Sequence, residues 1–150
     1  MKREFNVFMN KKKPSKEEKN NIVKFLFNHL EGFGDPMEYI LNAVNYALKE
    51  YSSFGGFILT TKINNELVGV VVINKTGMKD YIPENILVYI ATHKDFRGKG
   101  IGKDLVKKTI ELCEGDIALH VEPDNPAKFL YEKFGFKSKY LEMRYNSKDK

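Results

Sequence analysis

A glycine-rich turn joins an apolar β-type run to an amphipathic helical pattern in the middle of the chain, and this junction constrains the fold most strongly. The run Ile86–Ala91 is long enough and apolar enough to form a central strand. Glycines follow at positions 98, 100 and 102, and apolar residues then recur at helical spacing. A strand, a turn and a helix in this order are typical of α/β proteins, in which a crossover helix leads to a parallel strand.

The turn Arg97–Gly102 has the composition of an anion-binding loop. Its glycines remove side chains from one edge, so that backbone N–H groups can approach an anion closely. The helix that starts there adds unpaired N–H groups and the positive end of its dipole. Between Lys94 and Lys108, six basic residues stand against two acidic ones, and this net +4 is most of the chain's +5. The turn therefore predicts a phosphate-bearing ligand, and a pyrophosphate fits it best.

Five further strands are predicted by runs of apolar and β-branched residues. Two of these runs are separated only by Asn64-Asn65-Glu66, which is a hairpin signal. The predicted strands are Glu4–Met9, Phe57–Ile63, Leu67–Ile73, Ile117–Val121 and Tyr140–Tyr145.

Three further helices are predicted by start signals followed by helical spacing, over the ranges 15–30, 35–51 and 125–134. Ser15 and Glu18 form a capping-box pattern before the first. Asp35 and Pro36 have the pattern of an N-cap and a first helical residue before the second. The buried side of the helix after the glycine turn is predicted to be Ile101, Leu105, Val106, Ile110, Leu112 and Cys113.

The predicted element order is β-α-α-β-β-β-α-β-α-β. The hairpin implies antiparallel pairing, and the two later strand–helix–strand units imply parallel pairing. The sequence therefore predicts an α/β fold (an α+β mixed sheet), with a mixed twisted sheet and helices on both faces. A length of 150 residues with 42% hydrophobic residues fits one domain over residues 1–150.

Two common phosphate motifs do not match the turn. The P-loop pattern would need glycine in place of Arg97 and Ser or Thr in place of Asp104. The dinucleotide fingerprint would need its third glycine one residue after Gly102.

A third pattern does match. Arg97-Gly98-Lys99-Gly100-Ile101-Gly102 fits R/Q-x-x-G-x-G/A, and this segment resembles the pyrophosphate loop of the GNAT superfamily of acyl-CoA-dependent N-acyltransferases. Leu119-x-Val121, followed by Ala127-x-x-Leu130-Tyr131-x-x-x-Gly135-Phe136, resembles a later motif of that superfamily. The predicted element order also resembles its fold.

The resemblance implies an N-acetyltransferase that uses acetyl-CoA as co-substrate. It implies that Tyr131 donates a proton to the departing thiolate of CoA. It implies that the cofactor is held along the strand end, at the loop and before the last helix, by Ile90, Ala91, Thr92, Arg97, Gly98, Lys99, Gly100, Ile101, Gly102, Lys103 and Asn125.

The group that removes the proton from the amine is left open. Only about one alkylamine in a thousand is neutral at pH 7, so a base or a water relay must accept the proton. Ile86 stands where many members of the superfamily carry a glutamate. The candidates are Glu84, Glu122, His120 or a base acting through water. On helical spacing alone, Tyr131 could instead be a plain core aromatic.

The acceptor is predicted to be a primary amine of a small molecule or a protein. Two other functions stay open: a non-catalytic acyl-CoA-binding domain on the same scaffold, and a nucleic-acid-binding module suggested by the basic excess. The aromatic residues fall mostly inside apolar runs, which favours core packing over nucleic acid.

Scattered histidines and the single cysteine, Cys113, give no zinc spacing, and Cys113 is expected to be a buried core thiol. Neither a secretory signal nor a membrane span is recognisable, so a cytoplasmic protein is expected. A homodimer through the last predicted strand is kept open.

Overall fold

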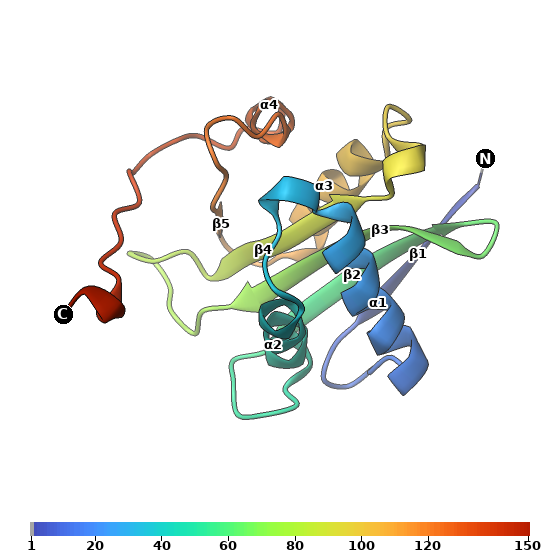
Figure 1. Ribbon diagram of the computed structural model, residues 1–150, viewed down its shortest axis with the longest axis horizontal. Coiled ribbons are helices and arrows are strands. Elements are labelled where there is room, and N and C mark those ends of the chain that lie inside the picture. The colour runs from blue at the N-terminus through green and yellow to red at the C-terminus, as the bar shows by residue number, and fades with distance from the viewer. Residues whose placement is uncertain (1) are drawn as a thin grey trace.

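The structure is a computed structural model that describes residues 2–150 (Figure 1). These residues form strands, α-helices and three short 3-10 helices. In chain order they are β1 (Arg3–Phe8), α1 (Lys16–His29), η1 (Glu31–Phe33), α2 (Met37–Leu48), β2 (Gly56–Ile63), β3 (Glu66–Lys75), β4 (Asn85–Thr92), η2 (Lys94–Phe96), α3 (Ile101–Leu112), β5 (Ile117–Leu119), α4 (Ala127–Lys133) and η3 (Ser147–Asp149).

The five described strands form one mixed sheet in the order β1-β2-β3-β4-β5. The first four strands pair antiparallel, and β4 pairs parallel with β5. The parallel pair follows from α3, which crosses over one face of the sheet between the two strands. The predicted mixed sheet and α/β class are therefore confirmed.

The hairpin between β2 and β3 forms where the sequence predicted it. Asn64 and Asn65 occupy its turn with φ of 51° and 65°. Two consecutive left-handed residues make a turn whose twist matches that of the strands, and asparagine tolerates this conformation well. The turn therefore fixes the register of the two strands.

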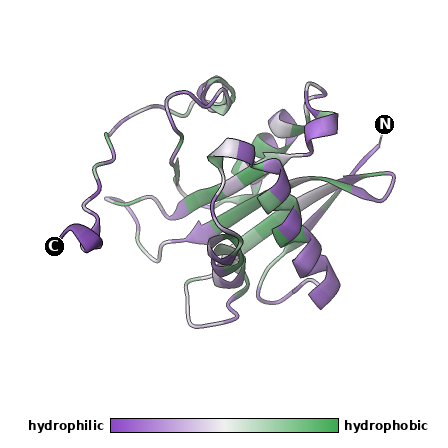
Figure 2. Cartoon of the chain, viewed as in Figure 1, coloured by the Kyte–Doolittle hydropathy of each residue, from purple (hydrophilic) through white to green (hydrophobic). Residues whose placement is uncertain are grey.

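Helices cover both faces of the sheet, as predicted. In Figure 1, α1 and α2 lie in front of the strands and α3 lies behind them. One core packs α1 and α2 on the sheet, and a second packs α3 on the opposite face. In Figure 2 the hydrophobic colour concentrates on the central strands, between these helices. The fully buried side chains include Leu26, Ile40, Leu48, Ile58, Leu59, Ile73, Ile101 and Leu105.

The predicted ends of the first two helices are confirmed only in part. The capping box before α1 is confirmed, since Ser15 and Glu18 exchange both hydrogen bonds. The N-cap prediction for Asp35 is wrong, because α2 begins at Met37 with Pro36 as its cap. The helix also ends at Leu48, where the following residue turns left-handed, so position 51 lies outside it.

The buried side of α3 is narrower than predicted. Ile101, Leu105 and Val106 are buried and Cys113 is half-buried, but Ile110 and Leu112 are exposed. Ile110 is nine residues after Ile101, which places it about 180° around the helix from that core residue. Leu112 lies in the last turn of the helix, near the end of its contact with the sheet.

The predicted strand Tyr140–Tyr145 does not form. This segment is extended and separate from the sheet (Figure 1), with Leu141 90% and Met143 91% exposed. Its apolar residues are left uncovered, since Tyr140 and Tyr145 are also exposed. Without burial, nothing offsets the entropy cost of ordering the segment in a sheet. Among the described strands, β5 therefore pairs on one edge only.

Candidate functional site

A gap opens between β4 and β5 beside the carboxyl half of β4. The two strands pair only up to Leu87 and Leu119, and Val88 is an extra residue in the register of β4 with β3. Such a bulge bends its strand and increases the local twist. Beyond it, β4 continues to Thr92 with no partner on the β5 side among the described residues.

The peptide groups of the predicted residues Ile90 and Thr92 face this gap. The His93 N–H donates to the Val68 carbonyl of β3 at 2.8 Å. Peptide groups along a strand alternate in direction, so those of Ala91 also point toward β3. Those of Ile90 and Thr92 point the other way, toward β5. The gap therefore presents both peptide groups of Ile90 and the N–H of Thr92 to an extended ligand, whereas the Thr92 carbonyl accepts from the Arg97 guanidinium at 3.5 Å.

The glycine turn leads directly from the end of β4 into α3. Gly98 and Gly100 have φ of 77° and 80°, a conformation that L side chains rarely adopt, and Gly100 caps α3. In the described part of the chain, no protein group accepts from the N–H groups of Gly100, Ile101, Gly102 and Lys103. Four free N–H groups at the start of a helix are the arrangement that binds an anion.

Arg3 orients this turn, and the sequence analysis did not identify it. Its guanidinium, on β1, donates to the carbonyls of Lys99 and Gly100 and pairs with Asp104. In a trans peptide the carbonyl and the following N–H point in opposite directions. Holding these two carbonyls therefore turns the N–H groups of Gly100 and Ile101 away from Arg3. A contact across about a hundred residues leaves no local signal in the sequence.

The predicted basic residues of the turn occupy different surroundings. The Arg97 guanidinium donates to the His29 carbonyl at 2.9 Å and to Glu31 at 3.1 Å, so it contacts the segment between α1 and α2. Lys99 lies 5.2 Å from the centre of the Phe96 ring. Lys103 is exposed on the first turn of α3. The two lysines therefore supply the accessible positive charge of the turn.

Tyr131 is buried on α4, with 6% of its surface exposed. Burial raises the pKa of its hydroxyl to about 12, so the group stays protonated throughout the neutral range. Its side chain makes no hydrogen bond to another described residue. The neighbouring Leu130 lies against Gly102, where an added Cβ would meet its Cδ2 at 3.3 Å. The structure therefore brings the helix of Tyr131 beside the glycine turn.

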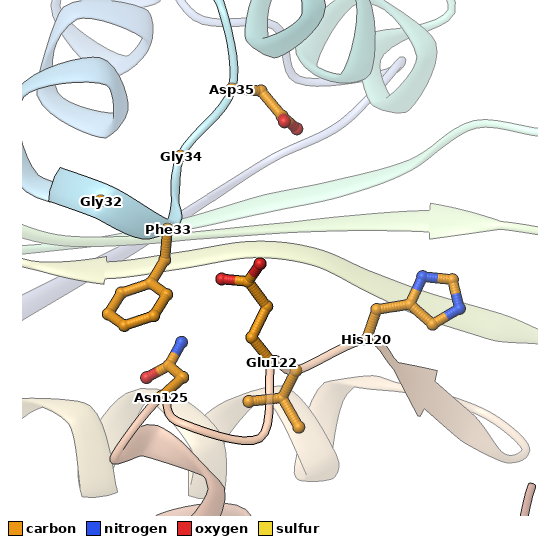
Figure 3. Close-up of a pocket in the computed structure, with 8 residues that line it drawn as sticks. Gly32, Phe33, Gly34, Asp35, His120, Glu122 and Asn125 are labelled. Atoms are coloured by element: carbon orange, nitrogen blue, oxygen red, sulfur yellow. The ribbon is translucent and has the colours of Figure 1, made fainter. Parts of the chain in front are cut away.

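A cavity of about 170 Å³ lies between the segment before α2 and the segment after β5. Figure 3 shows the side chain of Glu122 rising from one wall toward Phe33 and Gly34 on the other. Asp35 accepts a hydrogen bond from the Tyr89 hydroxyl of β4 at 2.5 Å. Burial, together with this carboxylate, raises the pKa of Tyr89. The lining consists of Gly32, Phe33, Gly34, Asp35, His120, Val121, Glu122 and Asn125.

Two of the three candidate bases lie in this cavity. His120 and Glu122 line it, on the segment that follows β5. Glu84 precedes β4 and accepts from the N–H of Asp116 at 3.4 Å, at the opposite end of the β4–β5 pair. Asn125 also lines the cavity, but its Oδ1 accepts from the Ala127 N–H at 3.0 Å and so supports the start of α4.

Two imidazoles in contact with each other, tilted by 34°, lie beside the start of the turn. The rings of His29 and His93 lie 4.2 Å apart, and the Nδ1 of His29 accepts from the Lys94 N–H at 3.1 Å. Burial lowers the pKa of His29, and the charges of His93, Arg97 and Lys94 lower it further. His29 is therefore neutral when it accepts this hydrogen bond.

Residues 2–150 contain no helix that is long and apolar enough to cross a membrane. Over the same part of the chain, no three His, Cys, Asp or Glu side chains are grouped as metal ligands.

Residues 24–136 match the model of the Acetyltransferase (GNAT) family. The crystal structure of PH1933 from Pyrococcus horikoshii OT3 is 27% identical, with a TM-score of 0.69 over 93% of both chains. The ribosomal-protein-alanine N-acetyltransferase from Brucella melitensis biovar Abortus 2308 has the same fold at 16% identity, with a TM-score of 0.65 over 97% of this chain and 99% of that one.

A shorter segment of the chain is similar in sequence to part of a much larger protein. The cysteine-rich protein 2-binding protein of Mus musculus is 39% identical over 56 residues, which are 37% of this chain. The Homo sapiens protein of the same name matches equally. The matched segment is only 7% of the length of these relatives.

Proposed function

The chain belongs to the GNAT family of acetyltransferases, and from this we propose that it transfers the acetyl group of acetyl-CoA to a primary amine in a ternary complex. The observation that carries the proposal is the continuity of the β4–β5 gap with the free N–H groups that begin α3. A linear ligand with an amide-containing arm and a pyrophosphate has complementary groups for both. We also propose that residues 1–150 act as one domain.

The residues around the gap suit acetyl-CoA. The peptide groups of Ile90 and Thr92, on either side of Ala91, would pair with the amides of the pantetheine arm. The N–H groups of Gly98, Gly100, Ile101 and Gly102 would bind the pyrophosphate, and Lys99 and Lys103 would add charge. Arg97 would hold the loop in place through its contacts with His29 and Glu31. Asn125 would shape the path of the arm by supporting the start of α4.

When bound, acetyl-CoA supplies a thioester whose carbonyl carbon accepts the amine. Tyr131 would protonate the departing sulfur, since its hydroxyl stays protonated at neutral pH and has no protein partner among the described residues. His120 or Glu122, directly or through water, would take the proton of the acceptor. Glu84 precedes β4 and lies beside Asp116 rather than in the cavity lining, so we do not propose it for this role.

The proposal is tested by incubating the purified chain with acetyl-CoA and a panel of amines, and by measuring both thiol release and the mass of the acetylated product. Titration with CoA measures binding independently. Thiol release that depends on an amine supports the enzyme. CoA binding without thiol release for any amine would instead support the non-catalytic acyl-CoA-binding domain. Absence of CoA binding would exclude both.

A further inference from the structure

We propose that the acceptor held in the 170 Å³ cavity is a short aliphatic diamine, whose second ammonium group is recognised by the cavity carboxylates. This inference rests on the proposed acetyl transfer and names the acceptor class for the same site. Its basis is the charge, the size and the fixed geometry of the cavity lining.

The cavity lining is acidic although the chain is basic. Asp35 and Glu122 contribute two carboxylates, and none of the lining residues is a lysine or an arginine. The whole chain has a net charge of +5. The nearby Arg97 does not cancel this acidity, because its charge is paired with Glu31 outside the lining. A cavity with a local charge opposite to that of the protein concentrates cations.

Proton balance distinguishes a diamine from a monoamine. The attacking nitrogen must first lose a proton, so a monoamine is neutral when it reacts. Once it has lost that proton, it leaves Asp35 and Glu122 without a cation in the transition state. A diamine keeps one ammonium group throughout the reaction, and that group can pair with a carboxylate in both the ground state and the transition state.

The bond changes are those of a direct acyl transfer. The C–N bond forms between the neutral nitrogen and the acetyl carbon, and the C–S bond breaks. The proton lost by the ammonium group passes to the base in the cavity or to water. The sulfur receives a proton from Tyr131, which solvent then replaces. The distal ammonium group of the diamine exchanges no proton in this sequence.

Asp35 is the carboxylate best fixed for the retained cation. Its Oδ2 accepts from the Tyr89 hydroxyl at 2.5 Å, and its Oδ1 makes no hydrogen bond to a described residue. One oxygen is therefore held by β4, and the other is available to an ammonium group. Phe33 adds an aromatic face on the same wall (Figure 3), and aromatic rings attract cations.

The size of the cavity matches a small amine. A protein cavity of about 150 Å³ holds benzene, which has six carbon atoms. The cavity of about 170 Å³ therefore matches a four-carbon diamine, which also has six non-hydrogen atoms.

The test compares three acceptors with the same four-carbon chain: putrescine, n-butylamine and γ-aminobutyrate. The second terminal group is then an ammonium, a methyl or a carboxylate. With the full chain and saturating acetyl-CoA, kcat/KM for putrescine should exceed that for n-butylamine about fivefold, the upper value for an ion pair at exposed carboxylates such as Asp35 and Glu122. γ-Aminobutyrate should be the poorest of the three.

The matched variants are Asp35→Asn and Glu38→Gln. Both remove one negative charge, but Glu38 is exposed on the first turn of α2 and does not line the cavity. Asp35→Asn should lower the putrescine to n-butylamine ratio, with Glu122 left as the remaining carboxylate, whereas Glu38→Gln should keep the ratio. Should Asp35→Asn unfold the chain, the ionic-strength dependence of wild-type KM replaces it: KM should rise more steeply with salt for putrescine, a dication, than for n-butylamine, a monocation.

Equal kcat/KM for putrescine and n-butylamine, or a preference for γ-aminobutyrate, would overturn the diamine proposal and leave acetyl transfer to amines intact. An unchanged ratio in Asp35→Asn would also overturn it. If all amines fail to release thiol although CoA binds, the proposed function fails as well, so the two failures are distinguishable.

Discussion

The guanidinium of Arg97 lies 3.1 Å from the carboxylate of Glu31, and this pair joins the glycine turn to the segment that walls the acidic cavity. A second contact, from Arg97 to the His29 carbonyl at 2.9 Å, connects the turn to the end of α1. The regions proposed to hold the cofactor and the acceptor are therefore in direct contact through one side chain.

Removing this pair should change kinetics more than stability. Arg97→Ala should raise the Kd for acetyl-CoA and the KM for the amine, whereas Glu31→Gln should raise only the KM, since the arginine charge remains. Both side chains are about half exposed (45% and 52%), so each substitution should lower the free energy of unfolding by less than about 1 kcal/mol. Arg144→Ala, which removes an exposed pair with Glu142, is the control and should change neither constant.

Alanine at Gly98 or Gly100 should destabilise the chain and weaken CoA binding. Both glycines have positive φ, which costs an L residue about 1–2 kcal/mol, and neither site has a steric clash that would add to this cost. Denaturant unfolding measures the stability, and titration with CoA measures the binding. Gly32→Ala, at a site with ordinary φ and open space, should stay within about 0.5 kcal/mol of wild type.

Tyr131→Phe should lower kcat about a hundredfold or more with little change in the Kd for acetyl-CoA, because it removes a proton donor and keeps the ring. The buried ring, 5.9 Å from the Phe136 ring, should keep its packing. Single-turnover kinetics and titration separate the two constants. An unchanged kcat across the pH range would exclude Tyr131 as the donor.

The same tyrosine should make the chain sensitive to alkali. Its pKa is raised to about 12 in the folded state, whereas an unfolded tyrosine has a pKa of about 10. Its stabilising contribution is therefore complete below pH 10 and is lost as the pH rises toward 12. Over that window, wild type should lose about 1.4 kcal/mol more per pH unit than Tyr131→Phe. Tyr140→Phe, at an exposed tyrosine, should follow the wild-type curve.

Acid should weaken the glycine turn through His29. Its pKa is lowered in the folded state, so the neutral form contributes stability above the unfolded pKa of about 6.5 that is lost at lower pH. Protonation also prevents its Nδ1 from accepting the Lys94 N–H. Affinity for CoA should fall from pH 6.5 downward. In His29→Asn, whose Oδ1 can accept the same bond without titrating, this fall should be smaller.

Local patterns in the sequence predicted most of the fold. The capping box of Ser15 and Glu18, the Asn64–Asn65 turn and the strand–turn–helix around the glycines each depend on neighbouring residues, and each was confirmed. The strand predicted at Tyr140–Tyr145 failed because strand formation depends on a partner face that no local pattern specifies.

The site was only partly predictable for the same reason. Asp35 matched an N-cap pattern, yet its carboxylate is held by Tyr89, which is 54 residues away in sequence. Arg3 and the Arg97–Glu31 pair likewise depend on contacts between distant segments. The roles proposed for Tyr131 and for the turn residues stay predictions until the kinetic experiments are done.

The half-buried position of Cys113 has a practical consequence for those experiments. Burial raises the pKa of its thiol to about 11, so at neutral pH almost none of it is the nucleophilic thiolate. Cys113 is the single cysteine of the chain. A chromogenic disulfide reagent should therefore report the released coenzyme against a low and slowly changing background, and neither masking of the protein nor replacement of its cysteine is needed beforehand.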